Sequence, residues 1–163
     1  MAIKCDSLGK FNNLMADIPG ILHEEIFRSL SYLAEQCIAR IRDRSGEDSW
    51  FDQTGNLRSS IGYAIYSEGR KLIESSFDVV RKGSYGAAHG KQMVDELASK
   101  YAETYALVVV AGMEYADFVE AMNNKDVLAS TELWAKAEVY KYLDRAKTRA
   151  ENRILKLYQQ LGS

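Results

Sequence analysis

The last fifth of the chain carries apolar residues at the spacing of one long helix. After Ser130 the run is Ala135, Val139, Leu143, Ala146, Ala150, Ile154, Leu157 and Leu161, at steps of 4, 4, 3, 4, 4, 3 and 4. Such steps place these side chains on one face of an α-helix, and Ser130 is the expected N-cap. A helix of this length must bury that face against the rest of the chain or against a partner, because tertiary packing supplies most of a helix's stability in water.

A second amphipathic helix is expected near the N-terminus. Asp17 is its candidate N-cap, and Pro19 falls in its first turn, where a missing N–H is tolerated. Its apolar residues recur at steps of three and four: Leu22, Ile26, Leu30, Leu33, Cys37 and Ile41. Residues 1–16 are expected to form an arm or a short separate helix.

The middle of the chain shows the period of two that is typical of strands. One face of residues 57–66 carries Leu57, Ser59, Ile61, Tyr63 and Ile65. Residues 73–79 alternate in the same way, and the turn expected at residues 67–70 makes the two strands an antiparallel hairpin. The apolar run Ala106–Ala111 predicts a strand covered on both faces, and therefore the central strand of the sheet.

Together these elements predict an α+β fold. We expect a small, mainly antiparallel sheet (the hairpin plus the central strand) packed against a long N-terminal helix and a long C-terminal helix. The glycine-rich residues 81–90 are expected to form a loop, and residues 91–104 a short helix. The 163 residues fit a single domain that spans 1–163.

The charges argue against a general nucleic-acid surface. A net charge of −2 results from 21 basic and 23 acidic residues, so no basic stripe follows the whole chain. The densest basic segment lies in the last helix and contains Lys141, Arg145, Lys147, Arg149 and Arg153. Acidic residues interleave with them, which is typical of a solvated helix face with pairs at i,i+4; a DNA-binding face is the alternative.

Cysteine usage and hydropathy indicate an intracellular protein. Cys5 and Cys37 form no metal-type spacing, and Cys37 falls on the apolar stripe of the first long helix, so we expect a reduced core thiol. The longest apolar run, residues 106–113, is far shorter than the roughly 20 residues that span a bilayer. We expect no membrane segment and a cytoplasmic location.

Three patterns suggest chemistry; two lack required residues, and the third has a plain structural explanation. His23 and Glu24 begin a zinc-protease helix, but Phe27 stands where the second histidine is needed. Residues 86–91 resemble a phosphate-binding loop without its first glycine and its hydroxyl residue. Three carboxylates within residues 114–120 can equally be the polar side of an amphipathic helix. We therefore expect no enzyme, no catalytic residue, no metal and no cofactor.

Two further segments form a more specific pattern. Residues 54–61 read TGNLRSSI, and residues 109–120 read VVAGMEYADFVE. This pair of segments, with an amphipathic helix before it and another after it, resembles the head–tail joining or tail-completion proteins (minor tail components) of long-tailed bacteriophages. The residues that carry the resemblance are Thr54, Gly55, Leu57, Arg58, Ser60, Ile61, Gly112, Tyr115, Ala116, Val119 and Glu120. The chain departs from the family after Glu120, where the family's glycine and its proline-containing stretch are missing.

The resemblance implies a structural virion protein of the phage neck. Copies of the subunit would form a ring, commonly sixfold, between the head connector or adaptor and the tail-tube proteins. The protein would stay in the host cytoplasm during assembly and then in the virion neck, with DNA contact only if it lines the channel. Two alternatives remain open: a nucleotide- or metal-dependent hydrolase that joins residues 83–90 to residues 114–120, and a DNA-binding module that uses the last helix.

Arg58 and Glu120 are the charged residues of the two matched segments. If the hairpin lies beside the central strand, a guanidinium–carboxylate pair can fix the helix after Gly112 against the hairpin. Two solvated charges and a pair between neighbouring subunits are the other expectations for these residues.

Overall fold

The computed structural model describes residues 7–43, 52–101, 104–114, 116 and 127–161. Its elements in chain order are α1 (Ser7–Arg42), α2 (Asn56–Ser59), β1 (Ile61–Ser67), β2 (Arg70–Glu74), α3 (Ser84–Leu97), the 3-10 helix η1 (Ala98–Tyr101), β3 (Ala106–Ala111) and α5 (Ala129–Leu161). Helices and a three-stranded antiparallel sheet confirm the α+β class. The chain divides into two compact units: Met1–Leu30 with Val139–Ser163, and Ser31–Glu138.

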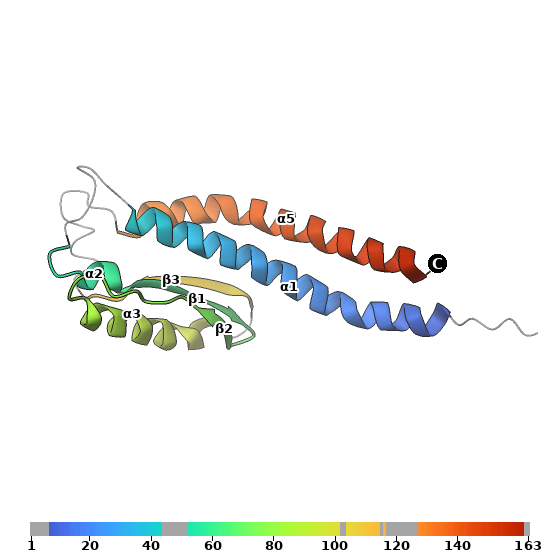
Figure 1. Ribbon diagram of the computed structural model, residues 1–163, viewed down its shortest axis with the longest axis horizontal. Helices are drawn as coiled ribbons and strands as arrows, with labels where there is room; N and C mark the ends of the chain where they lie inside the picture. Colours follow the sequence, from blue (N-terminus) through green and yellow to red (C-terminus); the bar gives the residue numbers. More distant parts are fainter. Residues whose placement is uncertain (1–6, 44–51, 102–103, 115, 117–126, 162–163) are drawn as a thin grey trace, which may run out of the picture. The chain divides into compact units, whose positions relative to one another are not determined.

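The first unit is an antiparallel pair of helix segments. The first part of α1 and the last part of α5 run side by side in opposite directions (Figure 1). Leu14 and Ile21 of α1 are buried, as are Ala146 and Ala150 of α5. The long C-terminal helix is thus confirmed, although it begins at Ala129, so Ser130 lies inside the helix and is not its N-cap.

The predicted start of the N-terminal helix was wrong. α1 begins at Ser7, so residues 7–16 belong to it and Pro19 lies in its interior. A proline inside a helix removes one backbone hydrogen bond and costs about 3 kcal/mol or more. Leu14 and Ile21 are both about 6% exposed, and their burial on either side of Pro19 offsets that cost.

The sheet of the second unit has the order β2-β1-β3. β1 pairs with β2 through the predicted hairpin, in which Glu68 and Gly69 have φ values of 49° and 73°, as expected of a type I′ turn. Ile61 of β1 pairs with Ala111 of β3, and Tyr66 with Ala106. The prediction of β3 as the central strand was wrong, because β1 lies in the middle and is buried on both faces from Ile61 to Tyr66.

Three other predicted boundaries differ from the structure. Residues 56–59 form the helical turn α2 and not the start of a strand. β2 ends at Glu74, whereas alternation predicted a strand to residue 79. The predicted loop at residues 81–90 is largely the first half of α3, which begins at Ser84; its glycines serve close packing, as described below.

Helices cover both faces of the sheet within the second unit. On one face, α3 packs on a core of Ala64, Tyr66, Val94, Val108 and Val110 (Figure 1), and the Tyr66 hydroxyl donates to the Val94 carbonyl at 2.8 Å. On the other face, the Tyr63 hydroxyl donates to the Glu35 carboxylate of α1 at 2.6 Å.

None of the helices in the described part of the chain combines the length and the apolar character that crossing a membrane requires.

Candidate functional site

The segment at residues 54–61 is held in a tight turn by the side chain of Asp52. One carboxylate oxygen of Asp52 accepts the Gly55 amide and the other accepts the Arg58 amide, both at 2.9 Å. The Asp52 carbonyl in turn accepts a hydrogen bond of 2.8 Å from the Arg81 guanidinium. An aspartate that caps amides a few residues later is familiar turn chemistry, so Asp52 was a signal that the sequence-based prediction missed.

Gly55 lets the chain enter α2. Its φ of 84° lies in the left-handed region, where a residue with a side chain is strained. A Cβ at this position would also lie 2.9 Å from the carbonyl carbon of Val80. Together, the Asp52 cap and Gly55 make residues 56–59 helical, although the side chains of this segment alternate like those of a strand.

The two segments that carry the family resemblance meet in the structure. The Gly112 amide donates to the Ser60 carbonyl at 3.2 Å, and Ile61 pairs with Ala111 in the sheet. Residues 60 and 61 of the first segment are therefore bonded to residues 111 and 112 of the second. We call this meeting point, from Asp52 to Ile61 together with Ala111 and Gly112, the motif junction.

Helix α3 closes the motif junction through glycines. A Cβ at Gly86 would lie 2.6 Å from the carbonyl carbon of Asn56, and one at Gly112 would lie 2.5 Å from the Cα of Gly90. The Gly86 amide also donates to the Asn56 side-chain oxygen at 3.2 Å. Side chains at these positions would push α3 off the junction, so the glycine-rich segment is a packing surface in this structure.

Two arginines connect the motif junction to the end of α1. Arg58 is half-buried and donates to the carbonyl of Arg42, where the negative end of the helix dipole favours a cation. Arg42 donates to the carbonyl of Ile61 at 2.6 Å and pairs with Asp78 at 3.3 Å. Arg58 lies on α2 and not on the strand predicted for residues 57–66.

The remaining predicted site residues divide into two groups. Gly55, Leu57, Ser60, Ile61 and Ala116 are buried, Gly112 is half-buried and Thr54 is exposed. Tyr115, Val119 and Glu120 lie outside the described residues, and with them the predicted pair of Arg58 and Glu120. The motif junction is thus built from the first segment and the beginning of the second.

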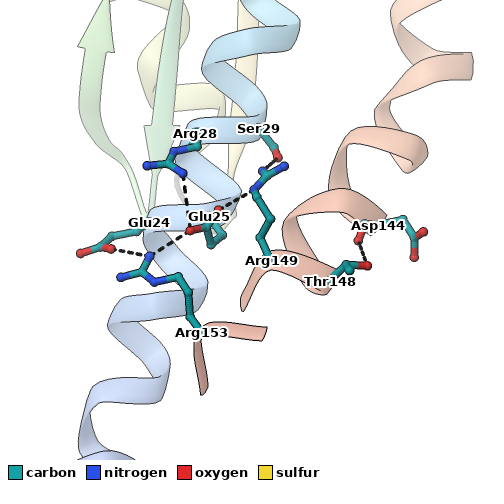
Figure 2. A network of polar contacts seen from close by, with 8 residues as sticks. All are labelled: Glu24, Glu25, Arg28, Ser29, Asp144, Thr148, Arg149 and Arg153. Atoms are coloured by element: carbon teal, nitrogen blue, oxygen red, sulfur yellow. Dashed lines mark hydrogen bonds and ion pairs between the residues drawn. The ribbon is translucent and has the colours of Figure 1, made fainter. Parts of the chain in front are cut away.

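Apart from the motif junction, a cluster of polar side chains around Glu25 joins the two helices of the first unit. Figure 2 shows its carboxylate between two arginines of α5, with Arg149 Nε at 2.7 Å and Arg153 Nη1 at 2.9 Å. Arg149 also donates to the Ser29 hydroxyl at 2.7 Å, and Arg28 lies 3.9 Å from Glu25. We call Glu25, Ser29, Arg149 and Arg153 the Glu25 cluster.

Because Glu25 is buried, the Glu25 cluster requires that its carboxylate be paired with the arginines. Glu25 is 1% exposed, so its charge depends on these partners. The hydrogen bond from Arg149 is the main cause that lowers the pKa of Glu25, and Arg153 and Arg28 act in the same direction against desolvation. Arg149 and Arg153, expected on a solvated face, therefore face α1, while Lys147 and Glu151 keep an i,i+4 pair at 3.9 Å.

The glycine-rich segment does not have the backbone geometry of a phosphate-binding loop, because residues from Ser84 onward form helix α3. His89 Nδ1 lies 3.0 Å from the carbonyl of Tyr85 on the same helix, and Lys91 lies 3.7 Å from Glu74. In the part of the chain that the structure describes, no three His, Cys, Asp or Glu side chains are grouped so that they could hold a metal ion.

Comparison of the chain with protein-family models, with curated proteins and with solved structures found no match.

Proposed function

We propose that this chain is a structural protein that joins the head connector to the tail of a long-tailed bacteriophage and acts by assembly of copies into a ring. The observation that supports this most is the motif junction. Two segments that resemble the family lie about 50 residues apart in the sequence, yet the Gly112 amide bonds the Ser60 carbonyl and Ile61 pairs with Ala111.

The construction of the junction suits a role in assembly. The Asp52 cap, the left-handed Gly55 and the contact of Gly86 with Asn56 hold the segment in one conformation. A surface fixed before binding loses little conformational entropy when a partner docks. Thr54 is exposed at this junction and would be available to a neighbouring subunit.

A ring follows from a contact that joins two different surfaces of the same subunit. Such head-to-tail contacts close into a ring when the rotation per subunit divides a full turn. The neighbours in the virion would be the head connector on one side and the tail tube on the other. The subunit would collect in the host cytoplasm and enter the virion neck during assembly.

Deletion of the gene from the encoding phage tests this proposal. We expect lysates with DNA-filled heads and separate tails in electron micrographs, and a plasmid copy should restore joined virions. Arg58→Ala should complement at least tenfold less well than the wild type, whereas Arg70→Ala, which changes an exposed arginine outside the junction, should complement fully. Thermal melting of both purified variants shows whether either has lost its fold.

Joined, infectious virions in the absence of the gene would refute the proposal. Full complementation by Arg58→Ala would refute the role that we assign to the motif junction.

A further inference from the structure

The first part of α1 has a second apolar stripe beside the one that packs on α5. Leu8, Phe11, Met15, Ile18 and Leu22 follow steps of 3, 4, 3 and 4, the spacing of a seam between two packed helices. Leu8, Phe11, Met15 and Leu22 are 59%, 41%, 51% and 40% exposed. This stripe is therefore largely uncovered, in contrast to the buried Leu14 and Ile21.

Helix α5 extends the uncovered surface. Leu155 and Tyr158 are 54% and 57% exposed, and a groove of about 450 Å³ between the helices is lined by these two residues together with Phe11 and Met15. We call Leu8, Phe11, Met15, Leu22, Leu155 and Tyr158 the apolar patch. All of them belong to the first unit.

The chemistry of the apolar patch favours an apolar helical partner. Its six side chains carry no charge, and Glu151 is the charged residue that lines the groove. A heptad-like stripe fits the side chains of a facing helix, and neutral surfaces can face identical copies of themselves without like-charge repulsion.

The size of the patch fits a weak contact between two proteins. Half-exposed side chains of this size offer roughly 80 Å² each, so the patch offers roughly 500 Å² per copy. Two copies would bury about 1,000 Å² in total, at the lower limit for a specific interface. The resulting association should be reversible and dependent on concentration.

We propose that the apolar patch is a contact between two copies of this chain, in which the patch of each copy covers that of the other and the two helix pairs form a four-helix arrangement. Each copy also brings an acceptor, the Glu151 carboxylate, and a donor, the Tyr158 hydroxyl, to the same groove. A contact that pairs identical surfaces closes on two copies. It is thus separate from the ring contact and does not rest on the proposed function.

Sedimentation of the full chain over a range of concentrations tests this contact. We expect the mass of the wild-type protein to rise reversibly toward twice that of the monomer. Met15→Glu and Leu155→Glu should each lower the association constant at least tenfold, because each places a charge in the contact. Leu133→Glu is the matched control: Leu133 is 70% exposed on α5 but lies outside the patch, and this variant should associate like the wild type.

Mixing separates a patch-to-patch contact from other associations. Met15 lies midway along the stripe, so the two Met15 positions should be close when the stripes face each other. A mixture of Met15→Glu with Met15→Lys should regain at least part of the association that each variant lacks alone. Helical circular dichroism should be the same for all variants.

Three results would overturn the proposal. The first is a wild-type protein that stays monomeric up to about 0.5 mM, well above the micromolar dissociation constant of a typical weak interface. The second is that the patch variants associate like the wild type. The third is that the two Met15 variants, each monomeric alone, also stay monomeric when they are mixed.

Discussion

Replacement of Gly86 by alanine has two opposing effects on the free energy of unfolding, a gain in helix propensity and a loss from overpacking. Alanine in a helix is normally favoured over glycine by up to about 1 kcal/mol, and Gly86 lies in the first turn of α3. A Cβ at this position, however, would lie 2.6 Å from the carbonyl carbon of Asn56 and would overlap the carbonyl oxygen. Carbon atoms in contact prefer about 3.5–4.0 Å, so α3 and α2 would have to separate by roughly 1 Å.

This separation should cost more than the propensity gain. Overpacking costs typically 1–3 kcal/mol, and backbone atoms of α2 cannot rotate away as a flexible side chain can. The hydrogen bond from the Gly86 amide to the Asn56 side chain, 3.2 Å long, would be lost as well, at about 1 kcal/mol. Less the propensity gain, we expect Gly86→Ala to destabilise the protein by about 2 kcal/mol net, which lowers the melting temperature by roughly 4–8 °C for a chain of this size.

Gly20→Ala is the matched control for this experiment. Gly20 also lies inside a helix, and a Cβ there would meet no atom within 4 Å. The same substitution should therefore stabilise the protein by up to about 1 kcal/mol. Thermal and urea unfolding, followed by circular dichroism, measures both variants. A Gly86→Ala protein that melts at or above the wild-type temperature would refute the close packing of α3 on the motif junction.

Two further predictions concern buried ionisable groups. Because its partners lower the pKa of Glu25 below the ordinary 4.5, the stabilising contribution of this carboxylate is complete above about pH 4.5 and is lost as the pH falls through its folded-state pKa. Glu25→Gln should thus cost about 2 kcal/mol at pH 7. Urea unfolding should show that the difference from wild type shrinks as the pH falls below about 4.5; a difference independent of pH would contradict this. Burial raises the pKa of the Cys37 thiol to about 11, so only about one molecule in a thousand carries the reactive thiolate at pH 8. In a Cys5→Ser background, a thiol reagent should label Cys37 only after denaturant is added, and rapid labelling of the folded protein would argue against the buried position.

Regular patterns predicted the long helices, the hairpin and β3. The apolar steps after Ser130 extend over many turns, and Gly69 supplies the positive φ that a tight hairpin turn requires. The bounds of β3, Ala106–Ala111, agree with the apolar run. In each case the deciding interactions are local or repeat at a fixed period, so one sequence is sufficient to reveal them.

The motif junction could be predicted only in part. Leu57, Ser59 and Ile61 alternate as in a strand, and only the cap from Asp52 and the turn at Gly55 make the first two helical. Residues 81–90 look like a loop from their composition, because glycine is usually read as freedom of the backbone. In this fold the glycines allow α3 to approach α2, a requirement that arises from tertiary packing.

The Glu25 cluster could not be predicted at all. Glu25 and Arg149 are 124 positions apart, and nothing in either helix states which turn of one will face which turn of the other. Glu25 lies next to Ile26, which the apolar pattern placed on the core face; in the structure Glu25 is the more deeply buried of the two. A charged residue takes that position because two arginines on α5 reach it.

The division of the first unit between Met1–Leu30 and Val139–Ser163 has a consequence for how the protein is made. On the ribosome, the stripe with Leu14 and Ile21 emerges early, and its cover on α5 is translated last. The second unit, Ser31–Glu138, is one continuous stretch of chain and is synthesised in between. During that interval the nascent chain exposes an apolar helix face and an unpaired Glu25, the kind of surface that chaperones bind and proteases attack. A chain that stops before residue 139 never covers that face, so only a polypeptide translated through α5 can complete the helix pair.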